Sequence, residues 1–261
     1  VSSKNDESSI LSNSIWSLYL DSDNKIWLGY YNKGVAKYDK LYDKFNNIAS
    51  YYNNPNSLQI GSVTSIAQRS NGDFLIGMDG GGIDIVDLEN NSFTHINISS
   101  KGEYTGLTSD YIQTIFIDSK ENIWAGRGIY FLRKGSKNFV NFNSANTNGD
   151  LVSNTVMSIT EDAGGTIWIG AYNSGLHSFD PVTRRFTHHN SQLFIESGVV
   201  DSEIWKVLVD KKDNIWLGTT KGLFHLEKQK GDIKRISPIV DKMSGGFKSN
   251  SAANHILSIF E

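Results

Sequence analysis

The chain has 261 residues, a formal net charge of −3, 38% hydrophobic and 20% charged residues, and no cysteine. This ordinary composition suits a globular protein with a real core, and the charge excludes a polybasic face for nucleic acid or an anionic membrane. The lack of cysteine excludes disulfides, thiolate metal sites and cysteine nucleophiles.

A tetrad of the form I-W-x-G recurs five times along the chain. Its glycines stand 48, 49, 44 and 48 residues apart, at Gly29, Gly77, Gly126, Gly170 and Gly218. A β-branched residue stands twelve positions before the second residue of each tetrad and opens a short apolar segment, at Ile15, Val63, Ile112, Val156 and Ile204. Segments rich in Asp, Asn, Gly and Ser, typical of tight turns, separate these two elements.

Two further strands follow each tetrad, such as "GLHSFD" and then "RFTHH" in the fourth copy. Four short strands in each period of 44 to 49 residues, without a helical period, predict an all-β fold, a β-propeller of four-stranded antiparallel blades. The predicted blades are approximately 14-48, 62-98, 111-142, 155-189 and 203-236, within one partial propeller spanning 1-261.

The tetrad residues have a structural interpretation. One large flat ring per blade can fill the wedge between neighbouring blades, and an aromatic side chain of this size buries roughly 150–250 Å². Leu75 replaces the tryptophan in the second copy, so we expect that junction to be packed less fully. The glycine allows close approach of a neighbour or a sharp turn.

The residues 255-261 repeat the beginning of a blade, and the chain starts within an inter-blade linker. We therefore expect five complete repeats plus the first strand of a sixth, as a fragment of a larger propeller. An open arc, or closure by a partner chain, is the corresponding prediction.

The consensus I-x-S-I-x-x-D, a turn, I-W-x-G and then G-L-x-x-F/Y-D resembles the two-component regulator propeller repeat. The best copies are "VMSITEDAGGTIWIGAYNSGLHSFD" and "IWSLYLDSDNKIWLGYYNKGVAKYD". The second copy departs from it at Arg69 and Leu75, and the third is short after its tetrad.

The resemblance implies a periplasmic sensor region of an inner-membrane hybrid histidine kinase that senses an oligosaccharide and controls transcription. It implies as partners the remaining propeller and a β-sandwich of the same chain, with a homodimer in the full-length protein. The kinase would lie outside this segment, so the segment itself is expected to be no enzyme, to need no cofactor and to make no nucleic acid contact.

The loops that follow the tetrads should converge at one end of the blades, where ligands usually bind. Ring faces for stacking, amides for hydroxyl groups, and charged or hydroxyl side chains make up the candidate ligand-binding set: Tyr31, Asn32, Asp79, Arg127, Tyr172, Asn173, Thr220 and Lys221. The alternative is that "YN-x-G" only builds a turn, with Asn and Gly at positive backbone angles.

Other functions stay open from the residues alone. A propeller glycoside hydrolase or lyase is one alternative, since "DAGGTIW" also looks like an Asp-box turn, but no catalytic triad, carboxylate pair or metal constellation emerges from the spacing. A protein-interaction scaffold without a ligand is another. His188 and His189 could form a metal pair, although exposed edge residues are the simpler interpretation.

Overall fold

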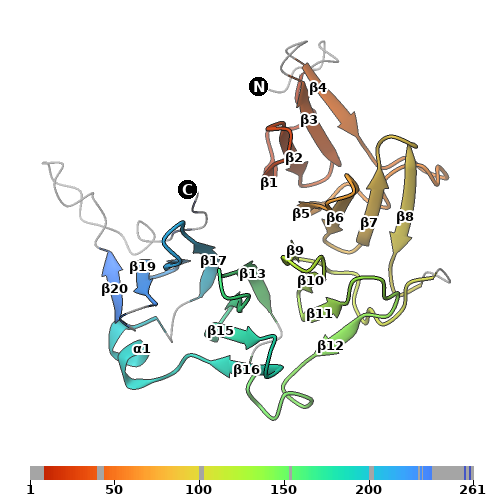
Figure 1. Cartoon of the computed structure of the whole chain (residues 1–261). Coiled ribbons are helices and arrows are strands. Elements are labelled where there is room, and N and C mark those ends of the chain that lie inside the picture. Colours follow the sequence, from red (N-terminus) through yellow and green to blue (C-terminus); the bar gives the residue numbers. More distant parts are fainter. Residues whose placement is uncertain are drawn as a thin grey trace, which may run out of the picture. The chain divides into compact units, whose positions relative to one another are not determined.

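The structure is a computed structural model that describes residues 9–39, 44–99, 103–152, 155–199, 203–228, 230, 232–236, 256 and 259. Five four-stranded antiparallel sheets follow one another along the chain, each with its strands in sequence order (Figure 1). They confirm the predicted blades.

The first three sheets have these strands. Blade one comprises β1 (Ile15–Leu20), β2 (Ile26–Tyr30), β3 (Val35–Asp39) and β4 (Lys44–Ile48). Blade two comprises β5 (Val63–Gln68), β6 (Phe74–Met78), β7 (Gly82–Asp87) and β8 (Ser92–Ile96). Blade three comprises β9 (Thr114–Ile117), β10 (Ile123–Gly126), β11 (Ile129–Leu132) and β12 (Val140–Phe142).

The last two sheets complete the set. Blade four comprises β13 (Val156–Glu161), β14 (Ile167–Ala171), β15 (Gly175–Asp180) and β16 (Arg185–His188). Blade five comprises β17 (Ile204–Val209), β18 (Ile215–Thr219), β19 (Gly222–Glu227) and β20 (Asp232–Ile236). The chain divides into two compact units, Val1–Asn141 and Phe142–Glu261, with the boundary inside β12.

A short helix that the sequence pattern does not predict lies between blades four and five. It is α1 (Gln192–Ser197), and it ends at Gly198 in the left-handed conformation. Its Phe194 is buried and its ring lies 5.4 Å from that of His189. A single anchored aromatic in six residues gives too little periodicity to be recognised in the sequence.

The tryptophan of each tetrad forms a hydrogen bond with the aspartate six residues before it. Asp21 Oδ2 accepts from Trp27 Nε1 at 2.8 Å, while its Oδ1 accepts the backbone N–H groups of Asp23 and Lys25. The same hydrogen bond, which we call the Asp–Trp tie, is present in blades three, four and five, as Asp118–Trp124, Asp162–Trp168 and Asp210–Trp216. One carboxylate thus fixes both the turn between the first two strands and the orientation of the ring.

The wedge interpretation of the tryptophans holds within the units. Trp27 is fully buried, and its ring lies 4.1 Å from that of Phe74 in the next blade. Trp168 likewise packs in a cluster with Ile204, Val207 and Ile215 of blade five. Each ring therefore covers the second strand of the blade that follows.

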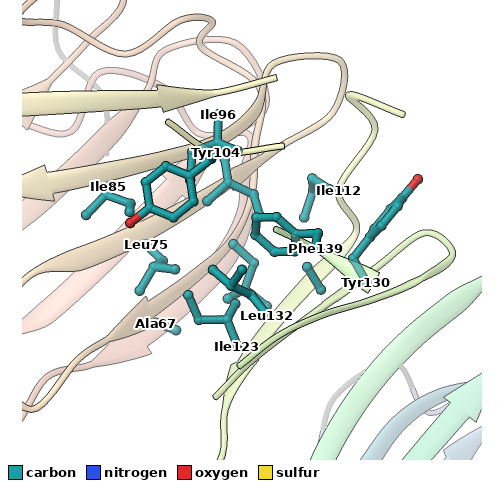
Figure 2. Packing of buried hydrophobic residues seen from close by; sticks show 13 residues of the cluster. Ala67, Leu75, Ile85, Ile96, Tyr104, Ile112, Ile123, Tyr130, Leu132 and Phe139 are labelled. Atoms are coloured by element: carbon teal, nitrogen blue, oxygen red, sulfur yellow. The ribbon is translucent and has the colours of Figure 1, made fainter. Parts of the chain in front are cut away.

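Blade two lacks both members of the tie, since Arg69 and Leu75 replace them. Leu75 is fully buried in a cluster that spans blades two and three and includes Ile85, Tyr104, Ile123 and Leu132 (Figure 2). Beside the turn between β5 and β6, a pocket of about 390 Å³ is lined in part by Tyr104, Ile123 and Leu132. Leu75 itself is fully buried and does not line this pocket, so looser packing at this junction stays a prediction.

The tetrad glycines touch the first strand of the following blade. A Cβ on Gly77 would lie 3.0 Å from both Ile112 and Ile115, and one on Gly170 would lie 2.6 Å from Ile204. The I-x-S serines bind across the same junctions, since Ser65 Oγ accepts from Ile115 N at 2.9 Å and Ser158 Oγ accepts from Val207 N at 3.1 Å. The glycine and the serine of the consensus are therefore blade-to-blade contacts.

Most of the predicted sixth-repeat strand, 255-261, lies outside the described residues, but Ile256 and Ile259 are described. Ile256 N donates to Thr219 O at 2.9 Å, as Ile112 N donates to Met78 O in blade two. A Cβ on Gly218 would lie 3.0 Å from Ile256 and 3.3 Å from Ile259. These contacts match those made by the first strands of blades three and five. The total number of blades and an open or closed arc stay predictions.

Candidate functional site at the loop end of the blades

The loops after the second strands are held by their own blades at what we call the loop end. In four blades the second residue after the tetrad glycine donates its N–H to the residue that precedes the first strand. The bonds are Tyr31 N to Ser14 O, Asp79 N to Ser62 O, Tyr172 N to Thr155 O and Thr220 N to Glu203 O, at 2.8 to 3.1 Å. The rigid sheet therefore presents these loops and the start of each first strand together.

In the first unit, Tyr31 lies against Trp16, with ring centroids 4.5 Å apart. Both side chains are about half-exposed, at 46% and 49%. Asn32 is exposed beside them. This aromatic pair offers an accessible apolar surface at the loop end of blade one.

Asp79 and Arg127 meet around a residue that the sequence reasoning missed, Tyr111. Asp79 forms an isolated antiparallel bridge with Tyr111, and the Arg127 guanidinium lies 5.3 Å from the centre of the tyrosine ring. Tyr111 is 49% exposed. Asp79, Tyr111 and Arg127 are therefore neighbours at the loop ends of blades two and three.

In the second unit, Tyr172 contacts the beginning of blade five. Its ring meets that of Trp205 edge-on at 6.0 Å, and the hydrogen bond from its hydroxyl to the Glu203 carboxylate raises the pKa of Tyr172. Thr220 Oγ1 accepts from Glu203 N at 3.3 Å, which places Thr220 in the same group. Tyr172 and Thr220 therefore lie together with Glu203 and Trp205 at the loop end of the second unit.

Asn173 and Lys221 do not join this group. Asn173 has a φ of 61° and Gly175 one of 69°, the positive backbone angles that the turn interpretation of "YN-x-G" predicts, while a contact of Asn173 with a ligand stays a prediction. Lys221 Nζ donates to Gly198 O at 3.4 Å in the linker after α1.

The sequence pattern did not predict four residues of the loop end: Trp16, Tyr111, Glu203 and Trp205. All stand at the start of a first strand, beside the β-branched residue that opens it. Antiparallel pairing puts that start at the same end of the blade as the loop after the second strand. This pairing was the signal that could have found them.

The histidines of blade four do not form an exposed edge, so that expectation is wrong. His188 stacks on His177 with ring centroids 4.5 Å apart, and its Nε2 lies 3.0 Å from Ser174 O. His189 stacks on Trp168 at 4.9 Å and bonds Ser178 Oγ. Pairing of β15 with β16 brings these rings together in the blade. No group of three or more metal-ligating side chains occurs in the described part of the chain.

The repeated four-stranded sheets define a β-propeller. The family model described as "Two component regulator propeller" matches residues 9–32 and 150–173, which are the starts of blades one and four. The chain therefore carries repeats of the two-component regulator propeller family, as the sequence resemblance predicts.

The chain is 28% identical over 208 residues to histidine kinase P4 of Formosa agariphila, a match that covers 75% of this chain and 15% of that protein. It is also similar to the extracellular domains of two hybrid two component systems of B. thetaiotaomicron. BT3049 matches with a TM-score of 0.73 and 21% identity over 97% of this chain, and BT4673 with 0.67 and 20% over 89%. The chain spans 33% and 30% of those two structures.

Within the described residues, no helix is long and apolar enough to cross a membrane.

Proposed function

We propose that this chain is a ligand-binding propeller segment in the extracytoplasmic, periplasmic sensor region of a hybrid two-component histidine kinase that controls transcription. The remaining propeller, a β-sandwich of the same chain and a second copy of the protein are its proposed partners. The repeat family and the kind of protein that the chain resembles support this role.

The proposed ligand is an oligosaccharide bound at the loop end. The observation that carries this proposal is the half-exposed pair of Trp16 and Tyr31, on loops fixed by backbone hydrogen bonds. Aromatic faces accept the C–H faces of sugar rings, and the nearby amide, carboxylate and guanidinium groups match hydroxyl donors and acceptors.

Isothermal titration of the complete sensor region with a panel of oligosaccharides tests the proposal. We expect saturable binding of one member, weakened at least about tenfold in Tyr31→Ala or Trp16→Ala, since each truncation removes one ring of the exposed aromatic pair. Tyr52→Ala is the matched control, because Tyr52 is 95% exposed in a linker and should leave the affinity unchanged.

The enzyme alternative is tested in the same samples. Chromatography of the recovered sugars should show no shortened products, and turnover would replace the sensor proposal by a hydrolase or lyase. Absence of saturable binding across the panel would favour an interaction scaffold.

A further inference from the structure

A second polar surface lies at the opposite end of the blades, which we call the turn end. It contains the turns between the first and second strands and between the third and fourth strands. The pocket at the junction of blades two and three lies here, entirely within the first unit. It is separate from the proposed oligosaccharide site.

The lining of this pocket is strongly cationic. Four cations and one carboxylate make up its charged side chains: Arg69, Arg133, Lys134, Lys137 and Glu121. Lys137 is already paired with Glu103 at 2.9 Å and with the Tyr104 hydroxyl at 3.1 Å. Across the described residues, no carboxylate lies within ion-pair distance of Arg69, Arg133 or Lys134. In the described part of the chain, three positive charges therefore line the pocket without an ion pair, and the one carboxylate of the lining, Glu121, accepts from Ser70 N at 3.4 Å.

The repeat explains why a cation can stand at residue 69. In the other four blades this position is the aspartate that binds the tryptophan and the turn amides. Loss of the tryptophan at Leu75 removes the indole N–H that such an aspartate accepts. The paired replacement therefore exchanges a turn-fixing carboxylate for a guanidinium that lines the same pocket as Ile123 and Leu132.

The frame that carries the other cations is held by hydrogen bonds. Lys134 N donates to Asn122 Oδ1 at 2.9 Å, and Asn122 is itself bonded to the Asp118 carboxylate. Ser136 N closes the same turn on Arg133 O at 2.9 Å. Backbone and side-chain bonds thus fix the turn in place, which lowers the ordering cost of binding.

We propose that this pocket binds an anionic oxyanion group, a carboxylate, sulfate or phosphate, either as a free ion or as a substituent of a larger ligand. Guanidinium groups match such oxyanions through paired N–H donors, and the Ser70 hydroxyl at the pocket adds a neutral donor.

Nuclear magnetic resonance titration of the 261-residue chain tests this site. Sodium sulfate, sodium phosphate and sodium glucuronate are each added against sodium chloride at equal ionic strength, with glucose as the neutral comparison. We expect saturable shifts of the Ser70, Lys134 and Gly135 amides with at least one oxyanion and none with glucose. Tighter binding of glucuronate than of the inorganic ions would identify an acidic sugar as the source, and the reverse order a free anion.

Variants assign the binding to these residues. Arg69→Gln and Arg133→Gln should each weaken it about tenfold, the loss typical of one charge-assisted hydrogen bond. Glu121→Gln should strengthen binding about threefold, because it removes the one negative charge of the pocket lining, which repels an anionic ligand. Lys120→Gln is the matched control, since it removes a cation from the same end of blade three but not from the pocket lining.

Unchanged amide resonances in blades one, four and five show that each variant is folded. Equal shifts with chloride and with every oxyanion, or wild-type affinity in both arginine variants, would overturn the proposal. Because the loop-end variants Tyr31→Ala and Trp16→Ala leave this pocket intact, its failure is distinguishable from failure of the oligosaccharide site.

Discussion

Blades two and four share one backbone pattern but place different chemistry at three equivalent positions. Blade four has Asp162 and Trp168, where blade two has Arg69 and Leu75. On the third strand, blade four has His177 opposite His188, where blade two has Asp84 opposite His95. The sheet itself therefore tolerates both sets, and the difference shows what each set adds.

The third-strand position anchors the linker that enters the blade. In blade two, Asp84 accepts from Gln59 N at 3.0 Å and from Gln59 Nε2 at 2.8 Å. In blade four, His177 Nε2 accepts from Val152 N at 3.4 Å. Blade two therefore binds its linker through a carboxylate, and blade four binds its linker through a neutral imidazole ring. The stability of the two blades should change in opposite directions as the pH falls.

The largest expected effect comes from replacing the tetrad tryptophan of blade four by the leucine that blade two has at this position. Trp168→Leu should lower the free energy of unfolding of the second unit by about 3 to 5 kcal/mol, because it leaves a cavity against blade five and removes the indole donor to Asp162. Urea unfolding followed by circular dichroism measures it.

Trp16→Leu is the matched control for this change. Trp16 is 49% exposed, so its replacement should cost about 1 kcal/mol or less. Equal losses in the two variants would show that the tetrad tryptophan is not a wedge.

The second prediction concerns acid. Burial, followed by the charges of neighbouring histidines, lowers the pKa of His177 to about 3 and that of His189 to about 4. Each ring stays neutral in the fold and takes up a proton on unfolding, so the stability present above about pH 6.5 is lost as the pH falls toward 4. The loss should reach about 3 kcal/mol for each ring at 1.4 kcal/mol per pKa unit. Urea midpoints of resolved amide resonances in the second unit measure it.

His177→Asp sharpens this prediction, because it gives blade four the pair found in blade two. The variant should lose less stability between pH 6.5 and 4 than the wild type. His225→Gln removes a histidine of blade five outside the cluster and should leave the acid response unchanged. An undiminished response in His177→Asp would place its origin elsewhere.

The third prediction concerns the pair in blade two. The hydrogen bond to Asp84, opposed by burial and aided by the charge of Asp84, raises the pKa of His95. This stabilisation is complete below about pH 6.5 and is lost as the pH rises through the folded-state value. Asp84→Asn should abolish that dependence and cost about 1 to 3 kcal/mol, because a fully buried acceptor of two Gln59 donors is replaced.

Urea unfolding of the first unit at pH 5.5 and pH 8.5 tests this expectation. Asp73→Asn, in the turn between β5 and β6 of the same blade, is the control and should retain the pH dependence. A pH dependence that survives in Asp84→Asn would exclude the pair as its source.

Repetition made the fold predictable from the sequence, because a fixed twelve-residue offset and a recurring glycine report the same hairpin five times. The tetrad tryptophans were correctly placed in the core, but their bond to the aspartate was missed, although both residues are absent together from blade two. The site was less predictable because Trp16 and Glu203 lie far in sequence from the loops that they join. Their proximity depends on strand pairing rather than on any local motif.

The smallest expected effect concerns the ion pair between Lys228 and Asp162, the aspartate that also binds Trp168 in blade four. Lys228 Nζ lies 2.6 Å from both Asp162 Oδ2 and Asp213 Oδ2, so a lysine of blade five reaches the carboxylate that also holds Trp168. Burial opposes ionisation of Asp162, but the bonds from Lys228 and Trp168 together lower its pKa. Since the lysine is 25% exposed, Lys228→Met should cost only about 1 kcal/mol at pH 7.

The contribution of Asp162 itself is lost as the pH falls below about 4, so Lys228→Met should leave the histidine-dependent loss between pH 6.5 and 4 intact. Urea unfolding at pH 7, 5 and 3.5 separates the two, and a variant that removed the loss above pH 4 would assign it to this ion pair instead of to the histidines.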